Sequence, residues 1–231
     1  MAVRSAYSLG LHREETMNEF IFTPEQMRIR RNLWKTLFIL DRFLAASLGR
    51  PTAITEEDCS CKIMPEQHDF SNLYTNGETD ISDIHNRSLD ACVRSCQMIG
   101  VTLGVFSQRK ISTSVVQKIV GTSKDLRHAA STGLYLRLAN EVPTSPAQGI
   151  AILHVHLLSL HFLILLTRQL FIMHNWKLEE QRSGLKKPYT IRESPMAKYS
   201  EACVIASYHT IRLVQNARKE KYLPQRNPFI M

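Results

Sequence analysis

A segment near the N-terminus carries complete start and stop signals for one long helix. Thr23 can cap the helix, Pro24 suits its first position, and Gln26 stands where a capping box needs a side-chain acceptor. At the other end, Gly49 is a natural stop signal and Pro51 cannot continue a helix. The sequence therefore predicts a helix that runs between Pro24 and Gly49.

One face of this helix is apolar but includes two charged side chains. Residues at steps of three or four share that face, and they are Met27, Arg31, Trp34, Phe38, Asp41, Ala45 and Leu48. Because burying an unpaired charge is costly, Arg31 and Asp41 are expected to have paired partners. We expect Asp41 to accept hydrogen bonds from a buried arginine or from the loop at Gly49-Arg50-Pro51.

The rest of the chain shows the same helical spacing, and strand signals are few. Apolar residues recur at steps of three and four over residues 82–107 and 111–132, and Ser194-Pro195 can cap a final helix. The predicted fold is all-α, an irregular multi-helix bundle around a long buried central helix. We expect a single domain over residues 1–231, with a charged internal connector at 177–193.

The predicted central helix, residues 149–176, is long and almost uncharged at its core. About twenty residues of this kind could span a bilayer. However, three histidines lie inside the apolar run and Arg168 follows it, and polar groups inside a membrane are expensive. A helix that is apolar all round also suits the centre of a large helical protein. We therefore expect a buried helix and no membrane partner, with a membrane-associated helical protein as the alternative.

A polar stripe crosses this helix. His154, His161 and Arg168 recur every seven residues and so share a face. They could line a cavity for a small-molecule ligand, or they could be three hydrogen-bonded side chains of the core, which is the more common arrangement. A shared metal is disfavoured because ligands two turns apart are about 10 Å apart along the axis.

Cysteine usage and charge exclude several classes of protein. Five cysteines at irregular spacing argue against a disulfide framework and suit a reducing compartment. The net charge of +8 is scattered rather than gathered into a nucleic-acid patch. No phosphate-binding loop, metalloprotease motif or nucleophile elbow is present. We expect no metal, no cofactor and no enzymatic activity in this chain.

The N-terminal helix region resembles the fungal-specific transcription factor domain. This is the regulatory middle homology region of zinc binuclear cluster, xylanolytic-activator-like transcription factors. The residues that fit its pattern are Arg30, Arg31, Trp34, Leu37, Phe38, Asp41, Arg42, Gly49, Arg50 and Pro51. Lys35 departs from the pattern because a second tryptophan is common at that position. We assign Arg30, Arg31, Trp34, Asp41, Arg42 and Arg50 to structure rather than to base contacts.

The resemblance implies a regulatory, non-DNA-contacting domain of a fungal sequence-specific transcription factor in the nucleus. Such a domain would control transcription by RNA polymerase II allosterically, in response to a metabolite. DNA and zinc would be bound only by a cysteine-rich N-terminal module that these residues lack, so the chain is expected to be a truncated domain. Its partners would be its own DNA-binding or activation segments, a small-molecule inducer and a second copy in a homodimer. The alternative is a stand-alone helical interaction module that has lost its DNA-binding half.

Overall fold

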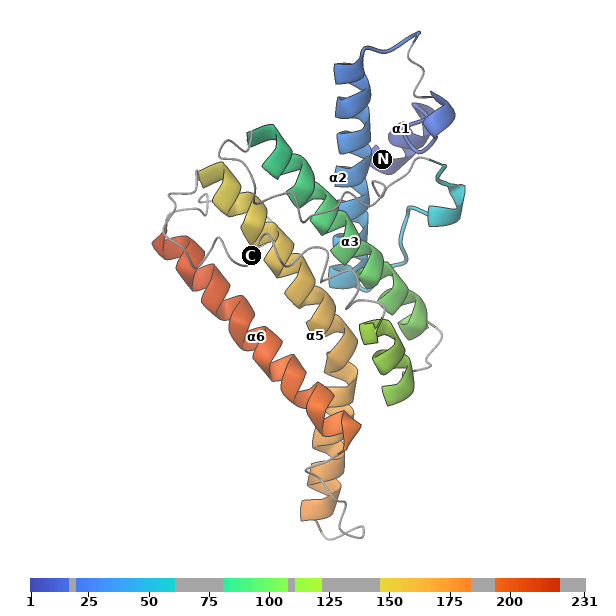
Figure 1. Ribbon diagram of the computed structural model, residues 1–231. Coiled ribbons are helices and arrows are strands. Elements are labelled where there is room, and N and C mark those ends of the chain that lie inside the picture. Colours follow the sequence, from blue (N-terminus) through green and yellow to red (C-terminus); the bar gives the residue numbers. More distant parts are fainter. Residues whose placement is uncertain (17–19, 61–80, 108–110, 122–145, 184–193, 221–231) are drawn as a thin grey trace. The chain divides into compact units, whose positions relative to one another are not determined.

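A computed structural model describes residues 1–16, 20–60, 81–107, 111–121, 146–183 and 194–220, and these residues form helices, turns and connecting segments (Figure 1). The long helices are α2 (Pro24–Leu48), α3 (Ile81–Ser107), α5 (Pro146–Arg182) and α6 (Pro195–Lys219). A short helix, α1 (Ala2–Ser8), comes first, residues 113–121 are also helical, and no strand occurs in these ranges. The predicted all-α class is confirmed.

The chain gathers into two compact units. Met1–Gly100 and Ala129–Val142 make up the first unit, and Val101–His128 and Pro143–Met231 make up the second. The single domain expected from the sequence stays a prediction. Of the helix expected over residues 111–132, the structure describes the stretch up to residue 121, and the remainder lies outside the described residues.

Helix α2 begins and ends where its local signals place it. The Thr23 side chain accepts from the backbone N–H of Gln26, and the Gln26 side chain accepts from the backbone N–H of Thr23. This reciprocal box satisfies two N–H groups that a helix start would otherwise leave without partners. Gly49 ends the helix with φ of 64°, a left-handed conformation that glycine adopts without a steric penalty.

The buried face of α2 differs in part from the predicted one. Its buried residues are Met27, Trp34, Phe38, Ile39, Arg42, Ala45 and Ala46. The prediction was wrong for Leu48, which is exposed, and for Arg31, which is only half-buried. The buried stripe is centred closer to Arg42 than expected, so Leu48 lies off its edge. The embedded arginine is therefore Arg42 and not Arg31.

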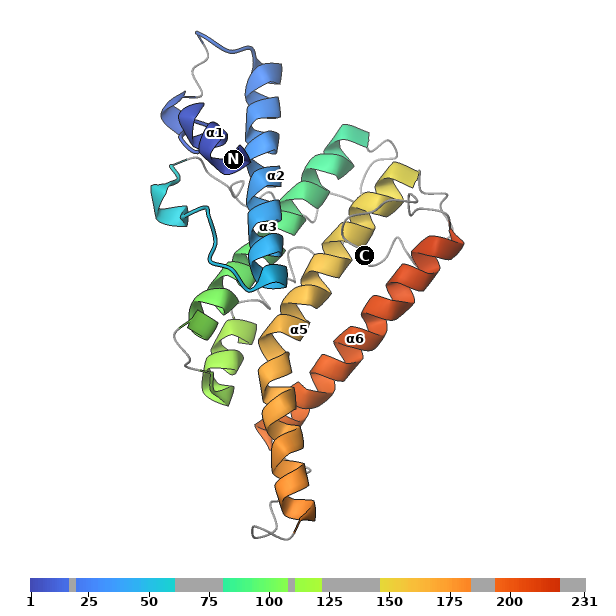
Figure 2. The same cartoon turned by 180° about the vertical axis from the view of Figure 1, so that it is seen from behind.

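Within the second unit, α5 and α6 pack along each other (Figures 1 and 2). Ser194 caps α6 as predicted, by accepting from the backbone N–H of Ala197. The buried residues of α6 are Met196, Ser200, Cys203, Ala206 and Ala217, which are mostly small and allow the two helices to approach closely.

Helix α5 is longer and less completely buried than expected. It is buried at intervals from Ile152 to Leu170, but Ile172, Met173 and Trp176 are exposed. In both views its last turns extend past the N-terminal end of α6 (Figures 1 and 2). The helix continues to Arg182, which corrects the predicted connector: residues 177–182 are helical, and 184–193 lie outside the described residues.

Among the residues that the structure describes, two stretches pass a length and composition test for crossing a membrane. They are Ser88–Phe106 and Gly149–Arg182, of which 44% and 50% are buried within the protein. Because the core helix of a folded protein passes the same test, this observation is weak support for a membrane span. The expectation that the chain has no membrane partner stays a prediction.

Candidate functional site

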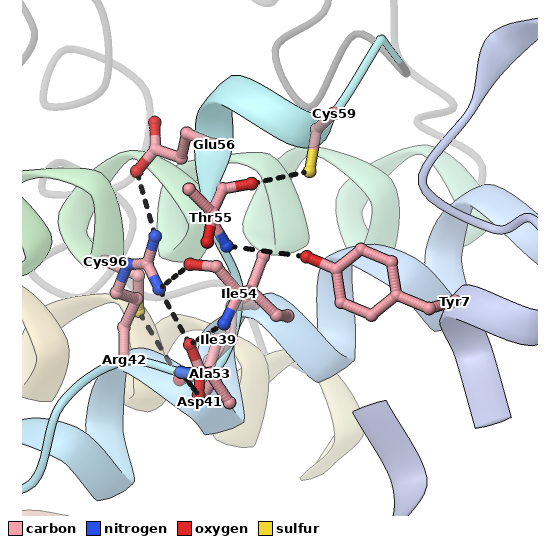
Figure 3. A network of polar contacts seen from close by, with 10 residues as sticks. All are labelled: Tyr7, Ile39, Asp41, Arg42, Ala53, Ile54, Thr55, Glu56, Cys59 and Cys96. Atoms are coloured by element: carbon pink, nitrogen blue, oxygen red, sulfur yellow. Dashed lines mark hydrogen bonds and ion pairs between the residues drawn. The ribbon is translucent and has the colours of Figure 1, made fainter. Parts of the chain in front are cut away.

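A buried arginine near the end of α2 organises the polar interior of the first unit (Figure 3). The Arg42 side chain is 4% exposed. Its Nη1 donates to Asp41 Oδ2 at 2.7 Å and to the carbonyl oxygen of Ile54 at 3.0 Å. Its Nη2 donates to Glu56 Oε1 at 3.2 Å. One guanidinium thus holds its helix neighbour and two positions of the segment that follows the helix.

Asp41 completes this cluster from the other side. Its carboxylate accepts from the backbone N–H groups of Ala53 at 2.8 Å and Ile54 at 3.1 Å, and the side chain is 8% exposed. Of the two partners expected for Asp41, the buried arginine is present. The backbone donors lie at Ala53 and Ile54, just beyond the expected Gly49-Arg50-Pro51 loop. We refer to Asp41, Arg42, Ala53, Ile54 and Glu56 as the Arg42 network.

Apolar and helical surfaces fix the arginine in place. Its guanidinium carbon lies 4.5 Å from the centre of the Phe38 ring, within the range of a cation–π contact. On α3, the Cα of Gly100 leaves just enough room, since a Cβ there would lie 2.9 Å from Arg42 Nε. Four residues earlier on α3, Cys96 Sγ donates to the carbonyl oxygen of Ile39 on α2 at 3.8 Å. The network therefore depends on close packing of α2 against α3.

An aromatic cluster joins the N-terminal helix to the same segment. The Trp34 side chain is fully buried, and the Tyr7 ring meets it edge-on with centroids 5.6 Å apart. The Tyr7 hydroxyl accepts from the backbone N–H of Thr55 at 3.4 Å, and burial raises the pKa of Tyr7. His12 packs against Tyr7, and its burial lowers the pKa of the imidazole.

The remaining residues of the family pattern also make structural contacts. Arg30 donates to the carbonyl oxygen of Leu9 at 2.8 Å, and Arg31 pairs with Glu14. Lys35, at the position where tryptophan is common, pairs instead with Asp90 of α3. Arg50 and Pro51 are exposed beyond the end of the helix, and the Arg50 backbone N–H donates to the carbonyl oxygen of Ala45.

The polar stripe of α5 lies in the second unit. His154 and His161 are half-buried, and burial lowers the pKa of both imidazoles. Arg168 is exposed, and its charge further lowers the pKa of His161. These three residues share a face as predicted from their spacing, and their role in a ligand cavity stays a prediction.

Other reactive groups are not arranged for chemistry in the described part of the chain. No cluster of three histidine, cysteine or acidic side chains that could hold a metal occurs there. Burial raises the pKa of the Cys92 thiol to about 12 and also raises the pKa of Cys96, so neither forms a thiolate at neutral pH. In the Arg42 network, the arginine is paired with the carboxylates of the same network. This arrangement is typical of a structural contact between segments and not of a catalytic site.

The sequence did not predict three of the features that hold the Arg42 side chain. The carbonyl of Ile54, the Glu56 side chain and the space at Gly100 all act on Arg42 from outside α2. Arg42 itself has a local signal, because it lies four residues after Phe38 and eight after Trp34, on the same face. Its partners have no such signal, since they are set by tertiary packing.

A known family model matches the N-terminal part of the chain. This model is described as "Fungal specific transcription factor domain". It matches residues 1–158, which include the whole Arg42 network. The chain belongs to the fungal-specific transcription factor domain family. The match includes His154, whereas His161 and Arg168 lie beyond it.

Relatives of this chain are fungal regulators. The chain is 26% identical over 224 residues to filamentous growth regulator 27 of Candida albicans. This alignment covers 93% of this chain and 27% of the relative. It is 40% identical over 57 residues to transcription factor FBD3 of Gibberella moniliformis (25% of this chain, 7% of the relative). It is also 35% identical over 80 residues to the acetamidase regulatory protein of Aspergillus fumigatus (35% and 10%).

These relatives are much longer than this chain. The chain spans about a quarter of the length of filamentous growth regulator 27, and about a quarter of the length of an uncharacterized transcriptional regulatory protein of Schizosaccharomyces pombe. Each of these two alignments covers 93% of this chain. No solved structure matches it. The family and these relatives are transcriptional regulators and not enzymes.

Proposed function

We propose that this chain is the regulatory, non-DNA-contacting domain of a fungal sequence-specific transcription factor that acts in the nucleus. The observation that carries the proposal is the family match over residues 1–158, which spans the Arg42 network. The domain controls transcription by RNA polymerase II allosterically. It acts on its own DNA-binding or activation segments, and the zinc and the base contacts belong to a module outside these residues.

The pairing of three cations on α2 supports a role away from DNA. Proteins position themselves on DNA largely through arginine and lysine side chains that contact phosphates and bases. In this chain, Arg31, Lys35 and Arg42 are each paired with a carboxylate. Cations that already neutralise acidic partners are poor candidates for phosphate contacts, which supports a structural role for these three side chains within the protein.

The allosteric part of the proposal needs an element with two arrangements that an effector can bias. The segment Ala53–Glu56 is suited to this role because three of its residues are fixed by Asp41 and Arg42. If those contacts open, the segment is released together with the contact from Tyr7 to Thr55. A two-position joint of this kind can pass a signal to a neighbouring module.

The domain's function can be tested by transplanting it. Residues 1–231 are inserted between a heterologous DNA-binding module and an activation segment, and reporter transcription is measured in a fungal host. We expect the insertion to change reporter output without changing promoter occupancy, and Asp41→Ala within the insert to abolish that change. A reporter that responds identically to the native and Asp41→Ala inserts would overturn the proposal.

The inducer part of the proposal places a small molecule at His154, His161 and Arg168. Two neutral imidazoles and one guanidinium would favour a metabolite that carries both a hydrogen-bonding group and a negative charge. Isothermal titration of the chain against a panel of carboxylated metabolites tests this idea, with Arg168→Gln as the matched variant. Binding that the variant weakens is expected, and binding that ignores the variant would place the ligand elsewhere.

A further inference from the structure

Helix α6 presents an apolar face to solvent, opposite the face that packs on α5. Four large side chains on it are about half exposed: Val204 (54%), Ile205 (48%), Tyr208 (56%) and Ile211 (58%). They recur at steps of one, three and three, so they form one continuous stripe, which we refer to as the α6 face. A clustered stripe of this kind marks an interaction surface more often than scattered apolar residues do.

Two opposite charges bracket the α6 face. Glu201 precedes the stripe and Arg212 overlaps its end, and both side chains are exposed. They are eleven residues apart, which is about three turns of helix, so they point in nearly the same direction as the apolar residues. Among the described residues, neither side chain has an ion-pair partner.

This arrangement is complementary to itself. When two copies of α6 are laid antiparallel about a two-fold axis between Ala206 and Ser207, Glu201 of each copy faces Arg212 of the other. The same axis sets Ile205 of each copy opposite Tyr208 of the other, in the middle of the stripe. Lys198, the next cation along this side of the helix, meets the uncharged Gln215. An isologous interface of this kind requires that one patch matches its own two-fold image.

We propose that the α6 face is a dimerisation surface whose occupant is α6 of a second copy of this chain, packed antiparallel. Apolar contacts between Ile205 and Tyr208 supply the centre, and the two Glu201–Arg212 pairs fix the register. An interface made from one helix pair is small, so the affinity is weak. The proposal goes beyond the regulatory function and stands on α6 alone.

A charge-exchange experiment tests the register directly. In Glu201→Arg, positions 201 and 212 both carry a positive charge. In Arg212→Glu, both positions carry a negative charge. Self-association of the whole chain is measured by sedimentation at about 100 μM, a concentration that suits a small interface. We expect the native chain to form dimers and each variant alone to self-associate about tenfold more weakly or worse, because like charges then face each other. An equimolar mixture of the two variants should recover dimers, because opposite charges meet again.

Two controls make the result decisive. Arg218→Glu changes the net charge by the same amount as Arg212→Glu but lies beyond the paired segment, so its dimer should persist. Helical circular dichroism must be unchanged in every variant, as expected for exposed positions. A native chain that stays monomeric, single variants that dimerise like the native chain, or a mixture that does not recover dimers would each overturn the proposal.

Discussion

At the scale of single residues, the central feature is a buried ion pair that satisfies the backbone of a following segment. Asp41 and Arg42 neutralise each other, and between them they bind two backbone N–H groups and one carbonyl of residues 53 and 54. Such a pair adds little net stability over an apolar pair of similar size, but removing one partner leaves the other charge buried alone. Its value is therefore in specifying where the segment lies while these contacts are made.

Removing the carboxylate should be strongly destabilising. Asp41→Ala leaves the Arg42 guanidinium without its closest anion and orphans two backbone N–H groups, so we expect a loss of about 3 kcal/mol or more in the free energy of unfolding. Urea denaturation followed by circular dichroism measures this change. As a control, Glu25→Ala breaks the exposed pair with Arg28 and should barely move the midpoint. A native-like midpoint for Asp41→Ala would contradict a structural role for the pair.

The space at Gly100 gives a second test at this scale. In Gly100→Ala the new methyl group lies 2.9 Å from Arg42 Nε and 3.3 Å from its Cδ, and the guanidinium is held by three partners and cannot move aside freely. We expect a net loss of about 1–2 kcal/mol despite the better helix propensity of alanine.

Gly104→Ala on the same helix is the matched control for that substitution. A Cβ at Gly104 meets nothing within 4 Å, so this variant should gain up to about 1 kcal/mol from helix propensity alone. Thermal melts of the two variants should therefore shift in opposite directions. A stabilised Gly100→Ala protein would show that the arginine is not confined by α3.

At the scale of elements, both ends of α2 and the start of α6 could be predicted because caps and stop residues are local. The Thr23 box, Gly49 and Ser194 act within a few residues of sequence. The end of α5 was missed because Lys177 to Arg182 look like a charged connector but are good helix formers. The partners of Arg42 could not be predicted, since they arise from separate elements brought together by folding.

The histidines of α5 should make the stability of the second unit sensitive to pH. Burial lowers the pKa of His154, His156 and His161 below the ordinary value of 6.5. Each imidazole therefore binds a proton more readily in the unfolded chain than in the folded one. Their contribution to stability is complete above about pH 6.5 and is lost as the pH falls through the lowered values.

Denaturation midpoints between about pH 7.5 and pH 5 measure this effect, since the slope reports the difference in bound protons. We expect the midpoint to fall on acidification and the fall to be shallower in His156→Phe, which removes one buried imidazole. A midpoint that stays constant over this range would show that the α5 imidazoles are solvated.

At the scale of the whole molecule, the chain comprises two compact units, and the family match extends across residues of both. The first unit holds the Arg42 network and the aromatic cluster, and the second holds the polar stripe of α5 and the α6 face. The proposed joint lies in the first unit, and the proposed ligand site and dimerisation surface lie in the second.

The most direct test of this account compares promoter occupancy with transcription for the intact factor and its Asp41→Ala variant. Both quantities are measured at one target promoter and normalised to the amount of folded protein. The account predicts unchanged occupancy per molecule and altered transcript per bound molecule, because the Arg42 network shapes control and does not touch DNA. Reduced occupancy per folded molecule, or an unaltered transcript per bound molecule, would contradict it.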